Sequence, residues 1–330
     1  MGLLFSFFTV IALVLIAFIG IKATNLQFFF GVIIPYAAFF TFILGVIYRV
    51  VRWGRAPVPF RIPTTAGQQK TLPWIKYSKL DNPFTTLDVI GRMALEVLLF
   101  RSLFRNTRLE LKTGPKLAYE WEKWLWLGGL AFHYSFLIIA LRHLRLFTQP
   151  VPYFVDLLER LDAFFQVGVP LLYLTDIFFL AAVTYLFLRR VVIPQMRYIS
   201  LAADYFPLFL IFSIGLSGVL MRYFIKVDVV GVKQLIMGLI SFNPIVPEGI
   251  GVIFFIHLFL VSTLLAYFPM SKLTHMAGIF MSPTRNLANN NRAKRHVNPW
   301  NYPVKVHTYE EYEEEFRDKM KEGGIPVEKE

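Results

Sequence analysis

Residues 124–147 are the segment that most restricts how this chain can fold. Their sequence, WLWLGGLAFHYSFLIIALRHLRLF, is apolar over a length that crosses a bilayer as a helix. Two histidines, His133 and His143, lie inside it. A polar, ionisable side chain within a membrane helix is energetically costly and usually has a function. The segment therefore predicts a transmembrane helix that carries chemistry.

The rest of the chain has the composition of an integral membrane protein. Of its 330 residues, 56% are hydrophobic and 34 are phenylalanine, which exceeds what ordinary soluble domains contain. We expect an all-α integral membrane fold in which six helices of about 20 residues span the bilayer. Pro35 is expected to kink the second of them. The predicted spans are 2–22, 26–48, 124–147, 166–188, 202–224 and 249–271.

The charged residues are concentrated in a few connecting segments. Segment 49–123 contains 14 Lys and Arg against 6 Asp and Glu, and segments 189–197 and 272–295 are also basic. In a six-helix bundle these three segments lie on one side, which the positive-inside rule makes the cytoplasm. We therefore expect the net charge of +12 to reflect membrane topology, with both termini cytoplasmic, rather than nucleic-acid binding.

The long basic segment contains a predicted helix of its own. Residues 85–104 place apolar side chains at helical spacing, with Arg92, Arg101 and Arg105 on or near the opposite face. This pattern indicates an amphipathic helix that lies at the membrane surface or against a partner protein.

The C-terminal tail is polar and also predicts a short helix. Thr308 and Glu311 form a capping box at its start, and Gly323 marks its end. We divide the chain into an extra N-terminal helix (1–25), a membrane domain (26–280) that includes the basic loop, and a cytoplasmic tail (281–330).

Four of the six histidines fall on two predicted helices, two on each. His257 and His275 are 18 residues apart, about 27 Å on a straight helix, whereas His133 and His143 are 10 residues apart, about 15 Å. Because the two helices run antiparallel, His133 should face His275 and His143 should face His257, although the axial spacings differ. One imidazole on each side of an iron is how a bis-histidine haem is held, so the pattern predicts two haems. Packing histidines and a histidine-only metal site are the alternatives.

Other polar residues are predicted in or near the membrane. Asp176 should lie about 15 Å into the fourth helix, where a lone carboxylate marks a proton or substrate path, the alternative being a partnered structural acid. Arg142, Arg145, Arg222 and Lys272 lie near helix ends, where they would pair with haem propionates or extend to the interface. Asp176 and Arg142 are the candidate catalytic residues.

The spacing of the two histidine pairs resembles the gamma subunit of membrane-bound respiratory nitrate reductase, a dihaem b quinol oxidase family, over roughly residues 26–280. The extra N-terminal helix, the long basic loop and a tail containing RAKRHVNPWNYP depart from that family. These parts resemble DsrM, the cytochrome b subunit of the DsrMKJOP complex of sulfur metabolism. The membrane subunit of heterodisulfide reductase is also similar.

The resemblance implies a function as well as a fold. It implies a subunit with two haem b groups that exchanges electrons between menaquinol or menaquinone and a cytoplasmic, DsrK-like iron–sulfur subunit, in dissimilatory sulfite or sulfate metabolism. His133 and His275 would hold the haem nearer the cytoplasm, and His143 and His257 the outer one. Further membrane and extracytoplasmic subunits would complete the complex, in which this chain is the quinol-oxidising electron-transfer subunit of an oxidoreductase.

The absence of cysteine agrees with an iron–sulfur centre in a separate subunit. The basic loop, its helix and the tail are then the expected docking surface, unless they form a simply solvated face. Electron flow in the reverse direction is equally allowed by the sequence. The alternatives are an anchor subunit of a heterodisulfide reductase-like or nitrate reductase-like complex, and a haem-free anchor or transporter subunit.

Overall fold

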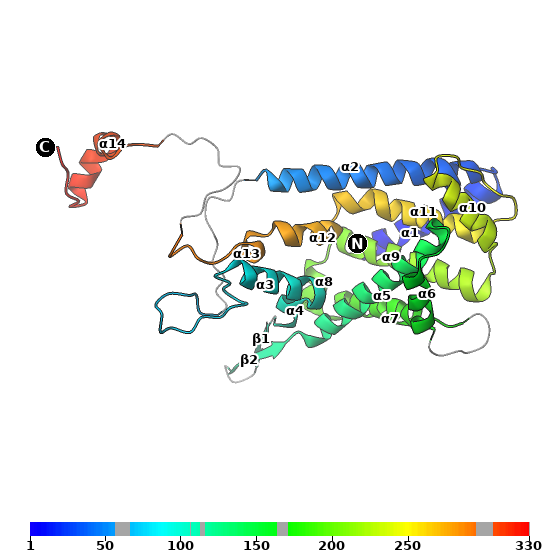
Figure 1. Cartoon of the computed structure of the whole chain (residues 1–330), viewed down its shortest axis with the longest axis horizontal. Coiled ribbons are helices and arrows are strands. Elements are labelled where there is room, and N and C mark those ends of the chain that lie inside the picture. Colours follow the sequence, from blue (N-terminus) through cyan, green and yellow to red (C-terminus); the bar gives the residue numbers. More distant parts are fainter. Residues whose placement is uncertain (57–66, 106, 113–115, 164–170, 295–305, 330) are drawn as a thin grey trace.

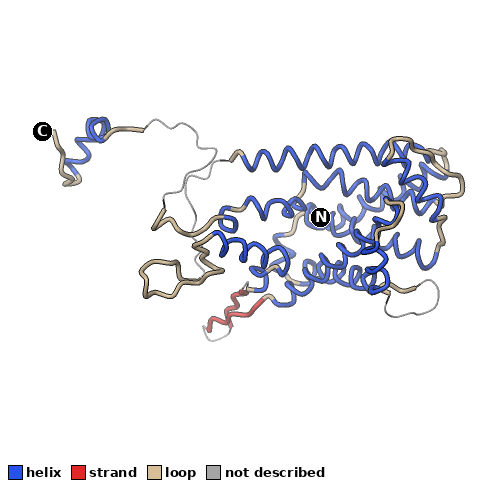
Figure 2. Tube along the Cα trace, in the orientation of Figure 1, coloured by secondary structure: helices blue, strands red, loops and turns tan. Residues whose placement is uncertain are grey.

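The computed structural model describes residues 1–56, 67–105, 107–112, 116–163, 171–294 and 306–329. Its long helices run along one axis and form a single bundle, while a small hairpin and the C-terminal helix lie at one end of it (Figures 1 and 2). The bundle helices are α1 (Gly2–Lys22), α2 (Ile34–Gly54), α5 (Lys123–Phe147), α7 (Leu174–Val192), α9 (Ala202–Val219) and α11 (Val252–Tyr267). Shorter elements join them: α3 (Thr86–Leu99), α4 (Arg101–Phe104), β1 (Thr107–Lys112), β2 (Lys116–Trp121), α6 (Tyr153–Asp162), α8 (Pro194–Ile199), α10 (Val229–Ile240), α12 (His275–Gly278), α13 (Pro283–Asn286) and α14 (Tyr309–Glu322).

Five helical segments among the described residues are long and apolar enough to cross a membrane. They are Gly2–Lys22, Phe29–Gly54, Lys123–Phe147, Ala202–Phe224 and Val252–Met270, close to five of the six predicted spans. The predicted span 166–188 differs, because the described helix there, α7, begins at Leu174 and ends at Val192. Its 19 residues include Asp176, Arg189 and Arg190, so it is less apolar than the other five. The protein is thus a multi-pass membrane protein, mainly helical, with one antiparallel two-stranded sheet of β1 and β2 that an all-α fold did not predict.

The basic segments gather at one end of the bundle. Arg49, at the end of α2, donates to the carbonyl oxygen of Pro269 over 2.6 Å, beyond the end of α11. Lys272 lies 2.7 Å from Asp204 in the first turn of α9, and Arg189 lies 3.2 Å from Glu122, next to the start of α5. The ends of α2, α7 and α11 and the starts of α5 and α9 therefore share one side (Figure 1). We call it the basic end, and the other side the opposite end.

Helix packing is close where glycine removes the side chain. A Cβ at Gly128 of α5 would lie 2.6 Å from the ring of Tyr185 on α7, and one at Gly215 of α9 would lie 2.5 Å from the ring of Phe179 on α7. The core of this half is formed by Phe179, Val183 and Ile211. A second core joins α1, α10, α11 and the start of the second span. Gly128 and Gly215 thus serve helix contact, as small residues commonly do in membranes.

Two of the bundle helices are irregular. A π-helical turn, Phe29–Ile33, precedes α2 and places Pro35 in its first turn, so the irregularity lies just before the proline. The last span was predicted as 249–271, and the spacing of about 27 Å for His257 and His275 assumed a straight helix, whereas the helix is shorter. It ends at Tyr267 and is followed by the 3₁₀ turns Phe268–Met270 and Lys272–Thr274, with Ser271 extended between them. Pro269 explains the break, because it lacks an amide hydrogen and disfavours continued helix.

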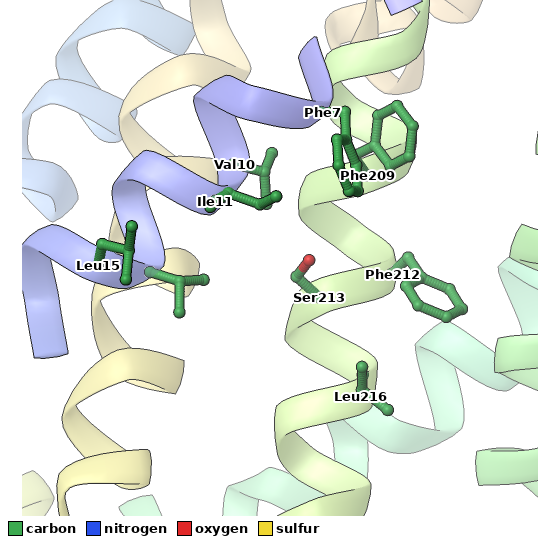
Figure 3. A pocket seen from close by; sticks show the side chains of 9 residues that line it. Phe7, Val10, Ile11, Leu15, Phe209, Phe212, Ser213 and Leu216 are labelled. Carbon is green, nitrogen blue, oxygen red and sulfur yellow. The ribbon is translucent and has the colours of Figure 1, made fainter. Parts of the chain in front are cut away.

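An open apolar groove runs between α1 and α9 (Figure 3). Phe7, Val10 and Leu15 line it from α1, and Phe209 and Leu216 line it from α9. Its lining is what a surface in contact with acyl chains requires.

The described part of the basic loop packs on the segment after α13. Asn289 donates to Asn82 over 2.7 Å, and its backbone N–H donates to Pro83 over 2.6 Å. Within the loop, Asp81 accepts hydrogen bonds from Arg101 and Arg105. Burial alone would raise the pKa of the Asp81 carboxyl, but these guanidinium groups and the Ser78 hydroxyl lower it to about 2. We call residues 67–105 and 282–294 together the platform.

Two capping boxes fix short helices outside the bundle. Thr85 and Asp88 cap α3, and Thr308 and Glu311 cap α14, which ends at Gly323 as predicted. Helix α3 has separate apolar and charged faces, and Arg92, which is 3% exposed, lies on the face that packs against the rest of the platform.

Candidate functional site

Two pairs of histidines meet between α5 and the chain of α11 and α12. His133 of α5 faces His275, the first residue of α12, with ring centroids 6.0 Å apart and ring planes at 83°. His143 of α5 faces His257 of α11, with centroids 6.5 Å apart and planes at 10°. The first pair lies towards the basic end and the second towards the opposite end. The mismatch in axial spacing does not arise, because the segment between Tyr267 and His275 is not a straight helix.

Each histidine is held through its Nδ1 atom. His133 donates to the carbonyl oxygen of Gly129 over 2.8 Å, His143 to that of Ile139 over 2.7 Å, and His275 to that of Lys272 over 3.0 Å. A carbonyl oxygen only accepts, so the proton resides on Nδ1 and Nε2 keeps its lone pair.

His257 is held by a neighbouring helix instead. Its Nδ1 lies 2.9 Å from the hydroxyl of Ser217 on α9. That hydroxyl donates to the carbonyl oxygen of Ile214 over 2.9 Å, so it accepts from the imidazole. The Nε2 atom of His257 is therefore also left with its lone pair, as a metal ligand needs.

The spacing of the pairs fits a metal held between two imidazoles. With metal–nitrogen bonds of about 2 Å, two facing rings have centroids about 6 Å apart. The described residues contain no cluster of three or more metal-binding side chains, so each pair stands as two ligands only. A six-coordinate iron in a macrocycle needs just those two. Gly218 also fits a flat group, because a Cβ there would lie 3.6 Å from the His257 ring.

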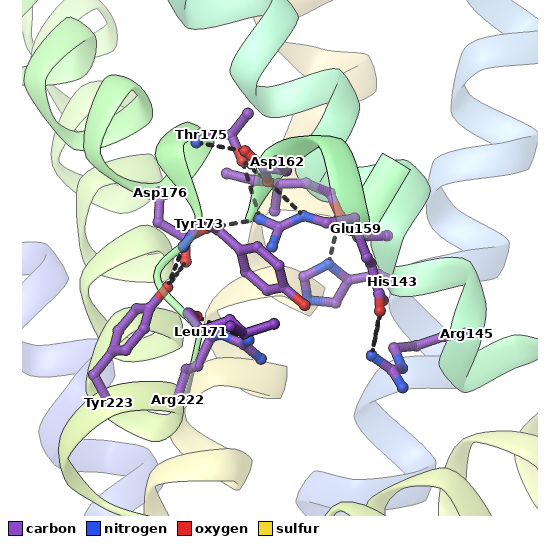
Figure 4. A network of polar contacts seen from close by, with 12 residues as sticks. His143, Arg145, Glu159, Asp162, Leu171, Tyr173, Thr175, Asp176, Arg222 and Tyr223 are labelled. Atoms are coloured by element: carbon purple, nitrogen blue, oxygen red, sulfur yellow. Dashed lines mark hydrogen bonds and ion pairs between the residues drawn. The ribbon is translucent and has the colours of Figure 1, made fainter. Parts of the chain in front are cut away.

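Asp176 is not the lone carboxylate in mid-membrane that the sequence predicted. It is the third residue of α7, in the first turn, because the helix begins at Leu174. Its carboxylate lies 2.7 Å from the Arg142 guanidinium and accepts a hydrogen bond of 2.8 Å from the Tyr223 hydroxyl (Figure 4). It is a partnered acid near the opposite end of the bundle.

Arg142 joins Asp176 to a second buried carboxylate. Its Nε atom lies 3.2 Å from Asp162, which also accepts 2.6 Å and 2.9 Å hydrogen bonds from the hydroxyl and backbone N–H of Thr175. The side chain of Arg142 is only 8% exposed. One guanidinium thus lies between two buried carboxylates, and each carboxylate is a charge taken out of water. Such a charge deep in a protein is costly without hydrogen bonds, and here hydrogen bonds surround it.

Arg222 extends the same group on the other face of Tyr173. The guanidinium carbons of Arg142 and Arg222 each lie 3.8 Å from the Tyr173 ring centroid, so the ring separates the two cations. Arg222 donates to the carbonyl oxygen of Leu171 over 3.1 Å, while its buried Nε has no hydrogen-bond partner. Arg222 therefore has a donor left for an anion.

The remaining predicted cations are already paired. Arg145 is held by Glu159 of α6 through two 2.8 Å hydrogen bonds, and Lys272 is held by Asp204. Arg222 is thus the predicted propionate partner with an unused buried donor, and it stands one helical turn beyond Gly218, beside His257.

Sequence reasoning missed several residues around these pairs. Ser217, Tyr173 and Tyr223 were not singled out, and neither was Phe100, whose ring centroid lies 4.9 Å from that of His133. Single serines and aromatics are common in membrane helices, so no local signal separates these from their neighbours. Their roles come from contacts between helices that are distant in the sequence.

Known proteins resemble this chain over most of its length. Residues 90–295 match the nitrate reductase gamma subunit family. A protein of Archaeoglobus fulgidus called "Hdr-like menaquinol oxidoreductase cytochrome b-like subunit" is 48% identical over 278 residues, covering 82% of this chain and 83% of its own. A protein of the same name from Archaeoglobus profundus is 44% identical over 274 residues, covering 81% of each. This chain belongs to the nitrate reductase gamma subunit family of membrane cytochromes b.

Proposed function

We propose that this chain is the haem b membrane subunit of a respiratory menaquinol oxidoreductase and that it binds two haem b groups. It passes electrons from menaquinol to a cytoplasmic, DsrK-like iron–sulfur subunit, in a complex of dissimilatory sulfur metabolism. The proposal rests on the two sites at which two imidazole rings face one another. At both sites, the Nε2 lone pairs are unused. The printed names of the two Archaeoglobus relatives support menaquinol as the quinol and an Hdr-like complex as the assembly. The sulfur connection rests on the resemblance to DsrM.

In this proposal His133 and His275 hold one haem, and His143 and His257 hold the other. Haem iron, when bound, supplies one-electron chemistry. The chain positions the two imidazoles, fixes their tautomers through Nδ1 and surrounds them with apolar helices. Arg222, with its unused Nε, balances a propionate at the opposite end.

Asp176 serves the quinol in the same proposal. A quinol loses two protons as it is oxidised, so a base within hydrogen-bond reach of its hydroxyl is needed. The ionised Asp176 is such a base, and Tyr223 and Arg142 orient it through its two oxygens.

The topology of the proposal assigns the basic end to the cytoplasm. Helix α7 then serves as a sixth span, antiparallel to its neighbours α5 and α9 although less apolar, and both termini are cytoplasmic. Menaquinol is oxidised near the outer pair and electrons leave from the inner pair. The platform, the hairpin and the tail lie where a cytoplasmic partner would dock (Figure 1).

The deciding experiment measures reduction of the inner haem by a menaquinol analogue. A His257→Ala variant should keep the inner haem yet lose its reduction by quinol, while dithionite still reduces it. An Asp176→Asn variant should keep both haems and slow the reduction by roughly 10²- to 10⁴-fold, the usual range for a lost general base. Asp156→Asn is the matched control, because Asp156 pairs only with Arg160 on an exposed turn of α6.

Two results would contradict the proposal. Purified protein with fewer than two haems would remove the dihaem assignment. A normal rate of quinol reduction in the His257 variant would place the quinol site at the basic end instead.

A further inference from the structure

Helix α3 has its polarity reversed relative to a helix on a soluble surface. Its charged residues point inward, with Arg92 3% exposed and Glu96 6% exposed. Its apolar residues point outward, with Leu87 79%, Ile90 58% and Leu98 55% exposed. These residues, with Val97, occupy one side of the helix, because positions 87, 90, 97 and 98 fall on one face at 3.6 residues per turn. We call the four the α3 stripe.

The inward face of α3 is satisfied by its own surroundings. Arg92 donates to the carbonyl oxygen of Asp81 over 3.2 Å. Glu96 accepts from the backbone N–H of Ser102 over 3.0 Å and from the Ser102 hydroxyl. The polar side of the helix is thus hydrogen-bonded within the platform, apart from the buried Nε of Arg92, whereas the α3 stripe has no cover within the part of the chain that the structure describes.

The end of α3 enters the bundle beside α5. The Trp126 indole donates to the carbonyl oxygen of Leu99 over 2.7 Å, and the Tyr134 hydroxyl donates to that of Leu98 over 2.8 Å. Tyr134 lies eleven positions after Lys123, about 16 Å along α5, and its side chain leans back towards the start of that helix. The last turn of α3 is therefore level with the first turns of a membrane-spanning helix.

The chain reverses direction at this point. Phe100 has φ 49° and ψ 45°, a left-handed conformation that bulky residues seldom adopt. It ends α3 and begins α4, whose Leu103 lies 3.5 Å from a Cβ placed at Gly129. Phe100 is consequently the deepest point of a helical reversal, with its ring against His133.

We propose that α3 and α4 form a re-entrant element that enters the membrane leaflet at the basic end, with the α3 stripe against lipid acyl chains. Trp124 and Leu127, in the first turns of α5, are also exposed and apolar. Aromatic residues at this level, Trp124 and Trp126, are typical of a membrane interface. Placing a helix of this polarity in lipid accounts for both faces at once, since the charges are paired inward and the apolar side meets an apolar solvent.

In this placement, lipid contacts the helical reversal around Phe100, whose ring packs against His133 of the inner pair. It does not depend on haem or on quinol, and it fails or stands separately from the proposed function. A protein partner on the α3 stripe is the competing occupant, and the experiment must separate the two.

The absence of cysteine makes the test direct, because one introduced cysteine is the sole thiol. Leu87→Cys, Ile90→Cys and Leu98→Cys are each labelled with a small fluorophore in the full chain, reconstituted in nanodiscs. Quenching by nitroxide-labelled lipid is compared with quenching by aqueous iodide. Leu44→Cys, exposed in the middle of α2, is the lipid control, and Glu314→Cys, exposed on α14, is the aqueous control. An unchanged thermal unfolding midpoint and a single gel-filtration peak show that each variant is folded.

We expect the Leu98 probe to behave like the Leu44 probe, and lipid quenching to fall from position 98 to 90 to 87 as the helix rises out of the leaflet. Iodide quenching of the Leu98 probe equal to that of the Glu314 probe would overturn the proposal. Protection of the Leu98 probe from both quenchers in the assembled complex would also overturn it, and would assign the α3 stripe to a protein partner.

Discussion

The two histidine pairs use the same ligands in different surroundings. The inner pair, His133 and His275, has perpendicular ring planes and lies among the rings of Phe100 and Phe132. The outer pair, His143 and His257, has nearly parallel planes. Figure 4 shows His143 on the side of the bundle that also holds Tyr173, Asp176 and Arg222. Two sites of one chemistry are thus given different electrostatics, and this is how a protein sets different potentials for two chemically identical cofactors.

The largest expected effect comes from removing ligands. His133→Ala and His275→Ala should each abolish the same haem, while His143→Ala and His257→Ala should each abolish the other. The measurement is haem content per chain together with the optical spectrum of the haem that remains. His307→Ala, on the exposed start of the tail helix, should retain both haems. If the two variants of one histidine pair lost different haems, the assignment of those two histidines to one haem would be wrong.

The ring angles predict a spectroscopic difference between the two sites. Parallel imidazoles donate into the same iron d orbital and separate the energies of the two d orbitals of π symmetry. Perpendicular imidazoles donate one into each orbital and leave the two energies nearly equal. The ferric inner haem, with planes at 83°, should therefore show the larger g anisotropy by electron paramagnetic resonance, compared with 10° at the outer site. The His257→Ala variant assigns the signals, and identical signals would remove this part of the comparison.

A smaller effect should follow from the unpaired donor of Arg222. Arg222→Gln removes a cation beside the outer pair, which favours the oxidised iron and lowers its reduction potential, by about 1–2 kcal/mol at an effective dielectric of about 20. Arg222→Lys should restore most of the shift, and Arg160→Gln, on an exposed turn, should cause none. Equal shifts of both haems in a redox titration would show that Arg222 does not act locally.

The smallest effect concerns acid, and it should appear on the inner side alone. The pKa of Asp81 is lowered to about 2 in the folded platform, so the stability it contributes is full above its unfolded pKa, near 4. That contribution is lost as the pH falls from about 4 towards 2. Amide hydrogen exchange in α3 after short acid pulses should rise across this window, and Asp81→Asn should abolish the pH dependence. Exchange in α7, beside the outer pair, is the internal control.

The sequence predicted what depends on local pattern. Apolar length located five spans, the counts of Lys and Arg located the basic end, and Thr308 with Glu311 predicted the start of α14. Which histidines face one another followed from helix direction alone.

The features that it missed depend on contacts between distant segments. Asp176 was placed in mid-helix because the start of α7 at Leu174 is not marked by a capping residue, and its partners Arg142 and Tyr223 are 34 and 47 residues away. Arg92 was expected on or near the face of its helix opposite the apolar residues, but what that face contacts was not predicted. Its inward orientation follows from the platform, which no local pattern reveals.

The hydrogen bonds on Nδ1 have a consequence for how the protein matures. Three of the four imidazoles are tied to a carbonyl oxygen three or four residues earlier, so their rotamers are fixed as soon as the local helix forms. The side-chain entropy lost in ordering them is lost during folding, so in the proposed dihaem subunit the macrocycle would bind imidazoles that are already ordered. The imidazole of His257 differs, because its hydrogen-bond partner Ser217 lies on α9, so it is ordered only after α9 has packed against α11. The outer site is therefore complete only when the bundle has formed. The imidazoles of the inner site, with local hydrogen bonds, are ordered earlier in folding.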